Sequence, residues 1–183
     1  MRSKILWFLG AALLVAALFL LDGGGSRSGA LAQTFSPGPG PASIQMLPAV
    51  EQEVGRITNA IRRQHGLPPL AADQVLVNIS RQHSWDMLRR GFFSHINPEG
   101  RSLQERLPPA YASHLSGWGE NIWTGSGYAP GNPLALARMM LDSWMSSPGH
   151  RRNILNPGYN RLGVGVAAWG REVRATQVFG EWR

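Results

Sequence analysis

The stretch Trp144-Met145-Ser146-Ser147-Pro148-Gly149-His150-Arg151-Arg152-Asn153-Ile154-Leu155 decides how this chain is expected to be organised. A helical apolar pattern runs into it, and the adjacent proline and glycine predict that the helix ends there in a tight turn. His150 follows directly, so we expect it on a rigid corner. Its expected partners lie in Phe92-Phe93-Ser94-His95 and Gly119-Glu120-Asn121-Ile122. The central prediction is a cleft where His95, Glu120 and His150 meet.

Size and composition limit the classes of protein that this chain can be. Its 183 residues suffice for one well-cored domain. It has no cysteine, which excludes disulfides and a thiol nucleophile. The formal charge is +7, and +5 without residues 1–32, which carry three basic residues and one acidic residue. This excess favours anionic surfaces such as phospholipid or acidic cell-wall polymer, although a solvated basic surface is the simpler interpretation. The arginines are scattered, so we expect no nucleic acid partner.

The N-terminal segment, residues 1–32, has the pattern of an export signal. Arg2 and Lys4 precede an uncharged apolar run, and Ala30-Leu31-Ala32 is typical of a cleavage site. The apolar run is also just long enough to remain as a membrane anchor. A signal peptide and an N-terminal membrane anchor are therefore both open.

The remainder of the chain divides into a linker and a domain. Residues 33–48 are rich in Pro, Gly and Ser and predict a linker without a core. Residues 49–183 are the expected folded domain. Either reading of the N-terminal segment predicts an exported domain that is secreted, periplasmic or anchored to the outer side of the cytoplasmic membrane.

Apolar spacing predicts three main helices. The first ends at Gly66 and has the apolar positions Val50, Val54, Ile57 and Ile61, with Asn59, Arg62 and Arg63 between them. The second begins at the N-cap Asp73 and ends at Gly91, with Leu76, Ile79, His83 and Met87 on its inner face. We interpret His83 as a core histidine rather than a catalytic one. The third begins at Asn132, with the buried stripe Ala137, Met140, Leu141 and Trp144.

The shorter elements complete this interpretation. Phe92-Phe93 is expected to fill the core, so that Ser94-His95 emerges from it. A strand is expected over residues 162–167, where apolar residues alternate with Gly163 and Gly165. These glycines would let another element approach closely. Gly170-Arg171 predicts a hairpin turn into a second strand over residues 173–179. Helices followed by a hairpin predict an α+β fold with an antiparallel sheet.

The order of these motifs resembles the bacterial SCP-like branch of the CAP superfamily (cysteine-rich secretory proteins, antigen 5 and pathogenesis-related proteins). The matching segments are Asn59-Ala60-Ile61-Arg62, Gly66-Leu67-Pro68-Pro69-Leu70, the three stretches quoted first, Gly163-Val164-Gly165-Val166 and Thr176-Gln177-Val178-Phe179-Gly180. The resemblance implies a three-layer α-β-α sandwich with a central, mainly antiparallel sheet.

The resemblance also implies a solvent-open cleft lined by two histidines and acidic residues, and lipid binding as a theme of the family. His95 and Glu120 match two corners of that cleft, and His150 matches the histidine of the bacterial members. Animal and plant members carry a further histidine before their Tyr-Thr-Gln segment. Arg174-Ala175-Thr176-Gln177 has none, so this corner is missing or replaced.

Three chemical interpretations of the cleft stay open. His95, Glu120 and His150 could ligate Zn²⁺ or another divalent metal and leave one position for water or substrate. Without metal, Glu120 could orient one histidine while the other acts as general acid or base. The trio could also be a polar brace that fixes loops. Ser94, Ser146 and Ser147 lack a nucleophile-elbow pattern and are expected in turns or caps.

Two functions follow from these interpretations. The favoured one is an extracytoplasmic module at the cell envelope that binds a ligand or metal, with lipid, glycan, cell-wall polymer or a protein as partner. The alternative is a metal-assisted hydrolase acting on peptide or cell-wall substrate, so enzyme activity stays open. Additional ligand-binding candidates are Asn121 and Gln177 beside the cleft and the cationic Arg151.

Overall fold

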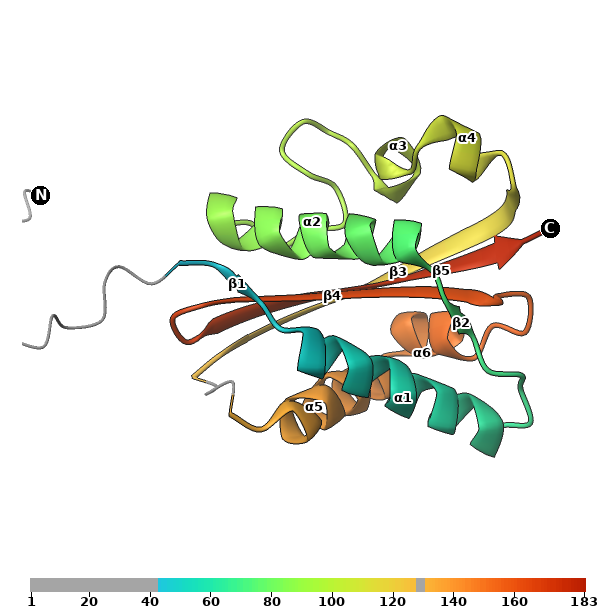
Figure 1. Ribbon diagram of the computed structural model, residues 1–183, viewed down its shortest axis with the longest axis horizontal. Helices are drawn as coiled ribbons and strands as arrows, with labels where there is room; N and C mark the ends of the chain where they lie inside the picture. The colour runs from blue at the N-terminus through green and yellow to red at the C-terminus, as the bar shows by residue number, and fades with distance from the viewer. Residues whose placement is uncertain (1–42, 128–130) are drawn as a thin grey trace, which may run out of the picture. The chain divides into compact units, whose positions relative to one another are not determined.

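The computed structural model describes residues 43–127 and 131–183, and these form a sheet between two helical layers (Figure 1). The strands are β1 (Gln45–Met46), β2 (Ala71–Ala72), β3 (Leu115–Ser126), β4 (Arg161–Trp169) and β5 (Glu172–Trp182). The predicted α-β-α sandwich is confirmed. The predicted signal or anchor and residues 33–42 of the predicted linker lie outside the described residues, whereas Gln45–Met46, at the end of that linker, pairs with β4.

The sheet is mainly antiparallel, in the order β1-β4-β5-β3, and β2 adds a short parallel pairing to β4. The predicted hairpin joins β4 to β5, and Gly170 takes a positive φ of 58° in its turn. β3 pairs with β5 from Leu115–Trp182 to Ser126–Glu172. The Gly119–Ile122 motif thus lies within a strand of 12 residues.

One helical layer contains α2 (Gln74–Arg90), α3 (Leu103–Arg106) and α4 (Pro109–Ala112). The Asp73 side chain caps α2, and Gly91 ends it in the left-handed conformation. α2 lies directly on β4, because a Cβ on Gly163 or Gly165 would stand 2.1 Å from the α2 backbone. The prediction that these glycines admit a close neighbour is confirmed.

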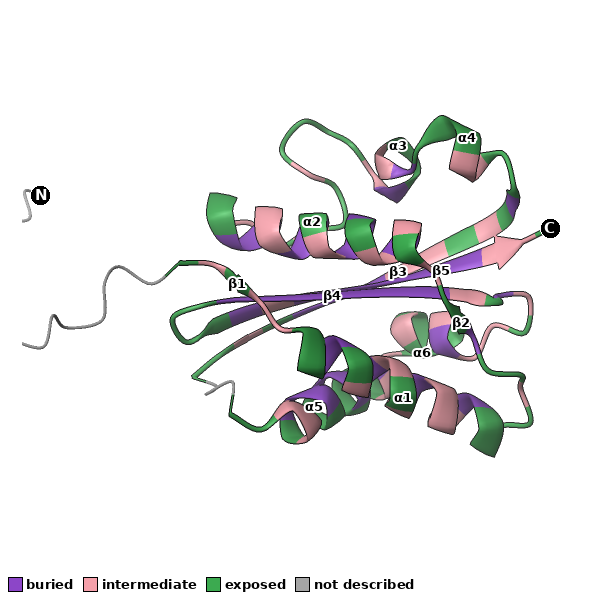
Figure 2. Ribbon diagram, in the orientation of Figure 1, coloured by how far each residue is buried: buried purple, intermediate pink, exposed green. Residues whose placement is uncertain are grey.

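The opposite layer contains α1 (Pro48–Gln64), α5 (Pro133–Ser146) and α6 (Pro148–Ile154). The predicted stripe of α5 is buried, and Figure 2 shows that buried positions of the helices face the sheet. The Trp144 indole is fully buried and donates to the Ile122 carbonyl across a distance of 3.0 Å. This bond fixes α5 against β3.

Two local predictions were wrong. Pro148 and Gly149 do not make a turn but open α6, since proline suits the first position of a helix, and His150 lies in its first turn. Phe93 does not fill the core, because 46% of it is exposed. The structure also shows that Arg62 is fully buried, which its sequence pattern does not predict.

Buried Arg62 joins the end of α1 to two loops. Its Nη1 donates to the carbonyls of Ile154 and Asn156, both at 2.8 Å, and its Nε donates to that of Pro68 at 2.9 Å. Burial lowers the pKa of the guanidinium, so these carbonyl bonds must replace lost hydration. Arg62 thereby fixes the segment that follows α6.

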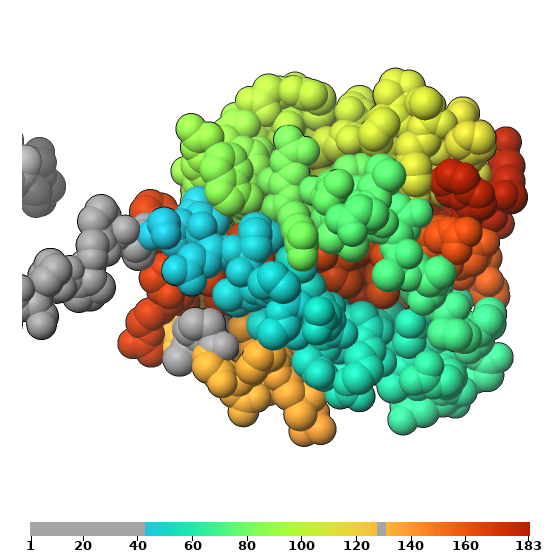
Figure 3. All heavy atoms as spheres, in the orientation of Figure 1, coloured from blue at the N-terminus to red at the C-terminus, as the bar shows by residue number. Residues whose placement is uncertain are grey.

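A groove of about 480 Å³ lies between α1, α2 and β4, and Figure 3 shows orange-red atoms between the two helices. Its apolar lining includes Leu70, Val77, Leu162 and Val164, and it contains none of the three residues of the predicted cleft. No helix in residues 43–127 and 131–183 combines the length and apolar character that crossing a membrane requires.

The contact between α2 and β4 predicts that Gly165→Ala destabilises the fold by at least about 3 kcal/mol, because the new Cβ collides with the α2 backbone. Gly55→Ala in α1 is the matched control, since its Cβ would meet only Leu162 Cδ2, at 4.0 Å. We expect Gly55→Ala to be neutral or stabilising by up to about 1 kcal/mol. Urea denaturation measures both, and equal effects would contradict the close-contact explanation.

The burial of His83 should make the free energy of unfolding depend on pH. The side chain is buried as expected, and burial, followed by the charge of Arg106, lowers its pKa from 6.5. Below pH 6.5 the unfolded chain protonates this imidazole while the folded protein keeps it neutral, so stability falls as the pH drops. Thermal unfolding of His83→Gln should therefore depend less on pH between about 7 and 5 than that of wild type. If the unfolding temperatures of wild type and His83→Gln change with pH in parallel, His83 does not cause the pH dependence of stability.

Candidate functional site

A buried carboxylate forms the centre of the candidate site. The Glu120 side chain on β3 is only 5% exposed, and both of its oxygens are engaged. Oε1 lies 2.8 Å from His95 Nδ1, and Oε2 accepts from Arg106 Nη2, also at 2.8 Å. Because a carboxylate accepts, His95 Nδ1 carries the proton and its Nε2 faces away from the bond. The structure thus brings His95 and Glu120 together.

The loop after α2 presents His95 to solvent through local hydrogen bonds. Ser94 Oγ accepts from the Ile96 amide at 3.1 Å, and Asn97 Oδ1 accepts from the Arg101 amide at 2.8 Å. The His95 carbonyl also accepts from Arg106 Nη2, at 3.2 Å. The His95 side chain is 52% exposed, so its ring can meet a ligand while its backbone stays fixed.

Arg106 was absent from the sequence prediction, although it supplies the main charge partner of Glu120. It ends the four-residue helix α3, where Ser102 and Glu105 form a capping box. The sequence does place an arginine in the segment between the stretches of His95 and Glu120. That signal was too general to select Arg106 from the other arginines.

Opposing influences act on the Glu120 carboxyl. Burial is the largest and would raise its pKa. The hydrogen bond from His95 and the charge of Arg106 are the main effects that oppose burial, and the pKa lies below its usual value. Glu120 is consequently ionised at neutral pH, and its charge is balanced by Arg106.

His150 approaches this group from α6. Its carbonyl accepts from Asn121 Nδ2 at 3.2 Å, and Asn153 Nδ2 donates to the Glu120 carbonyl at 3.1 Å. These bonds fix the first turns of α6 to β3. Burial, followed by the charge of His95, lowers the pKa of the half-buried His150 ring. His150 is therefore a neutral imidazole at neutral pH, and among the described residues its ring makes no hydrogen bond to His95 or Glu120.

The additional ligand-binding candidates lie away from the exposed surface of the site. Asn121 and Gln177 are fully buried, and Asn121 Nδ2 donates to Gln177 Oε1 at 3.1 Å. Gln177 Nε2 donates in turn to Thr58 Oγ1 at 2.8 Å. Arg151 is exposed and donates to His65 Nε2 at 3.3 Å. Asn121 and Gln177 thus brace the interior, and Arg151 points to a neighbouring part of the surface.

The predicted metal ligands do not fit a metal in this arrangement. No three His, Cys, Asp or Glu side chains of the described residues are grouped so that they could hold an ion. Both Glu120 oxygens are already bound, and the guanidinium of Arg106 supplies the positive charge that a metal would bring. Metal binding by His95, Glu120 and His150 stays a prediction, and it would require the ion pair between Glu120 and Arg106 to break.

The serines near the site have structural roles. Ser94 Oγ accepts from a backbone amide, as described, and Ser146 Oγ donates to the Asp142 carbonyl at 2.8 Å. Ser147 is the residue between α5 and α6. Among the described residues, neither the Ser94 nor the Ser146 hydroxyl is hydrogen-bonded to a histidine, as the hydroxyl of an activated serine would be. Within the part of the chain that the structure describes, the site presents polar groups suited to recognition, and the Ser94 and Ser146 hydroxyls are not activated as nucleophiles.

Comparison with solved structures supports the fold. An extracellular protein from Bacillus anthracis that contains an SCP domain is 31% identical, with a TM-score of 0.58, over 73% of this chain and 41% of that chain. An outer surface protein from Borrelia burgdorferi has a TM-score of 0.67 over 78% of this chain and 99% of that chain. Its identity is 13%, so it shows the fold alone.

Sequence comparison extends the similarity to two proteins of Bacillus subtilis (strain 168), both uncharacterized. The membrane protein YlbC is 37% identical over 116 residues, which cover 63% of this chain and 31% of YlbC. YkwD is 34% identical over 130 residues, which cover 71% of this chain and 46% of YkwD. The match spans less than half of either relative. The model of the cysteine-rich secretory protein family, CAP, matches residues 56–179, and the chain therefore belongs to the CAP family.

Proposed function

We propose that this protein is a ligand-binding module that acts outside the cytoplasm, with a glycan of the cell envelope as its ligand. One observation carries the proposal: the buried Glu120 carboxylate is held by His95 and Arg106 at 2.8 Å each. This arrangement fixes an exposed imidazole in one orientation. A fixed, electrically balanced polar surface suits recognition of hydroxyl and amide groups.

The chemistry of the site favours binding over hydrolysis. An acid or base catalyst requires a carboxylate or imidazole that can exchange its proton with substrate, whereas Glu120 is 5% exposed and balanced by Arg106. The sequence contains no cysteine, and Ser94 and Ser146 are engaged in structural bonds. A metal-assisted hydrolase would require the Glu120–Arg106 pair to break first.

The location rests on similarity and on the N-terminal pattern. The similar Bacillus anthracis protein is described as extracellular. Residues 1–32 have the charge and hydropathy of an export signal or anchor. A glycan is preferred over a lipid because the apolar groove between α1 and α2 shares no residue with the His95–Glu120 group.

The proposal predicts that purified peptidoglycan retains the wild-type protein in a sedimentation assay and that His95→Ala with His150→Ala reduces retention at least about tenfold. Both substitutions remove polar contacts from the exposed part of the site. Arg138→Ala on α5 is the matched surface control and should bind as wild type does. Retention by phosphatidylglycerol vesicles alone would identify a lipid surface instead and refute the glycan ligand.

The Glu120–Arg106 pair predicts that the protein binds no stoichiometric Zn²⁺. One solved protein of similar fold, NaASP2, is described with Zn²⁺, which makes the comparison informative. After dialysis against zinc, wild type and the His95→Ala/His150→Ala double variant should contain equally negligible metal. Arg106→Gln frees one Glu120 oxygen and should bind Zn²⁺ more tightly than wild type by calorimetry. One zinc per wild-type protein, lost in the double variant together with peptidoglycan cleavage, would establish the hydrolase.

A further inference from the structure

An open hollow lies at the end of α6, beside the segment that Arg62 holds in place. Its volume is about 410 Å³. The residues that line it are Arg151, Arg152, Leu155, Asn156 and Pro157. His95, Glu120 and His150 are not part of this lining, so the hollow is separate from the candidate site. Because α6 also carries His150, the hollow adjoins that site along one helix.

The charged side chains that line this hollow are both cationic. Arg151 and Arg152 are exposed, and no carboxylate of the described residues forms an ion pair with either. The Glu181 carboxylate lies near the same segment, 3.1 Å from where a Cβ on Gly158 would stand, but it does not line the hollow. Two exposed, unpaired cations in one hollow favour an anionic ligand.

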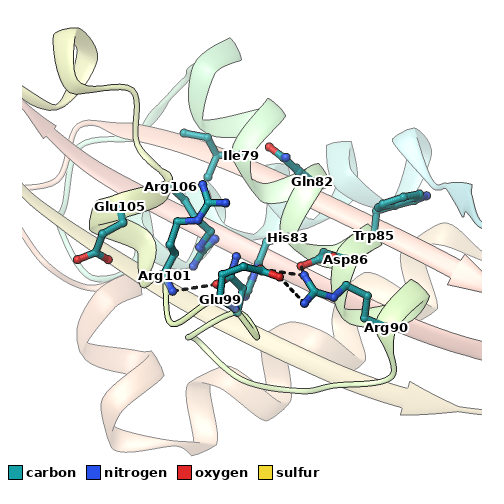
Figure 4. A pocket seen from close by; sticks show the side chains of 11 residues that line it. Ile79, Gln82, His83, Trp85, Asp86, Arg90, Glu99, Arg101, Glu105 and Arg106 are labelled. Atoms are coloured by element: carbon teal, nitrogen blue, oxygen red, sulfur yellow. Dashed lines mark hydrogen bonds and ion pairs between the residues drawn. The ribbon is translucent and has the colours of Figure 1, made fainter.

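The cavity that α2, the loop after α2 and α3 enclose has no such excess of charge (Figure 4). Its lining contains equal numbers of cationic and anionic side chains, namely Arg90, Arg101, Arg106, Asp86, Glu99 and Glu105. Arg90 and Glu99 are paired with each other, at 2.5 Å. Unpaired positive charge therefore distinguishes the hollow at α6 from this cavity.

The two guanidinium groups extend in different directions. Arg151 reaches α1, where its Nη2 donates to His65 Nε2 at 3.3 Å. His65 Nδ1 lies 2.9 Å from the Ile61 carbonyl, which only accepts, so Nδ1 carries the proton and Nε2 can accept. Arg152 instead follows α6 back toward its start, with Nη2 3.8 Å from where a Cβ on Gly149 would stand. An extended ligand with repeated charges suits this separation better than one compact anion.

Leu155 and Pro157 add apolar surface to the same hollow. A phosphodiester has its charge inside a chain, with an alkyl carbon on each side, so its oxygens can face arginine while its carbons cover the apolar surface. A carboxylate ends a branch, and a sugar that carries it would place hydroxyls on that surface. The lining thus favours a polymer of polyol phosphate units.

A membrane surface is a weaker match to this hollow. Proteins that bind in the interface of a bilayer insert large apolar side chains into the acyl boundary. Among the described residues, the large apolar side chains that are exposed are Phe93, Ile96, Trp118, Met139 and Trp169. None of these lines the hollow. It therefore offers contacts to phosphate without an apolar anchor.

We propose that the hollow binds a polyol phosphate polymer of the cell envelope, with Arg151 and Arg152 each binding one phosphodiester. The inference rests on the proposed function, because it takes the ligand from the cell envelope, and it adds an anionic contact beside the glycan site. The planar fork of a guanidinium donates two parallel hydrogen bonds to the oxygens of one phosphate. Two such contacts bind successive units of the polymer.

Calorimetric titration of the full-length protein with a synthetic hexamer of glycerol phosphate tests this site. Arg151→Gln with Arg152→Gln should weaken binding of the hexamer at least about tenfold, because two charge-assisted contacts are lost. Arg138→Gln with Arg183→Gln is the control, since it removes the same charge from exposed positions outside the hollow. The control should weaken binding less than about twofold. Equal losses in the two variants, or no binding of the hexamer by wild type, would overturn the proposal.

Two other probes identify the class of ligand. Hexagalacturonate, which carries six carboxylates, should bind at least about tenfold more weakly than the hexamer, and so should phosphatidylglycerol vesicles at equal accessible phosphate. Equal or tighter binding of hexagalacturonate would mean that any polyanion suffices, and equal or tighter binding of the vesicles would indicate a membrane surface. Either result would overturn the polyol phosphate ligand.

The variants also separate this inference from the proposed function. His95→Ala with His150→Ala should keep the affinity for the glycerol phosphate hexamer while it reduces retention by peptidoglycan. Arg151→Gln with Arg152→Gln should still be retained by peptidoglycan from which phosphate polymers have been removed. Loss of hexamer binding in the histidine variant would contradict a separate site for phosphate.

Discussion

The ion pair between Glu120 and Arg106 is the constraint that holds β3, α3 and the loop after α2 in their arrangement. The carboxylate is 5% exposed and the guanidinium side chain is 11% exposed, so neither charge is well hydrated. Loss of one partner would leave the other as an uncompensated charge, at a cost of about 3–5 kcal/mol. The pair holds β3 to α3, and the bond from Arg106 to the His95 carbonyl adds the loop after α2.

The position of that pair depends on how closely α2 approaches the sheet. Gly163 and Gly165 let the α2 backbone rest on β4, and Ser84 Oγ donates to the Gly165 carbonyl at 2.9 Å. A larger residue on β4 would lift the helix together with His83 and the loop that it bounds. On the opposite side, buried hydrogen bonds run from Asn153 through Asn121 and Gln177 to Thr58, connecting α6, β3, β5 and α1. Both helical layers are therefore fixed to the strand that carries Glu120.

The parts of the fold that sequence could predict are those where one pattern has one physical solution. The apolar spacing of α2 predicts its buried face, and alternate glycines on β4 predict a close neighbour. Pro148-Gly149 has two solutions, a turn or the start of a helix, and the structure contains the helix. Buried Arg62 was unpredictable because three of its four partners are carbonyls of residues 92 to 97 positions away, and backbone carbonyls carry no side-chain signal. Arg106 escaped prediction for a related reason, since only the folded loop brings it to Glu120.

The position of Arg106 changes what the His–Glu pattern can mean for function. In isolation, two histidines and a glutamate suggest a metal site, because imidazole and carboxylate are good metal ligands. Once a guanidinium binds the same carboxylate, the positive charge comes from the protein and His95 is fixed as a donor to Glu120. Arg106 also lines a separate cavity beside His83 (Figure 4). Because Arg106 binds both the Glu120 carboxylate and the His95 carbonyl, the orientation of His95 depends on this one side chain.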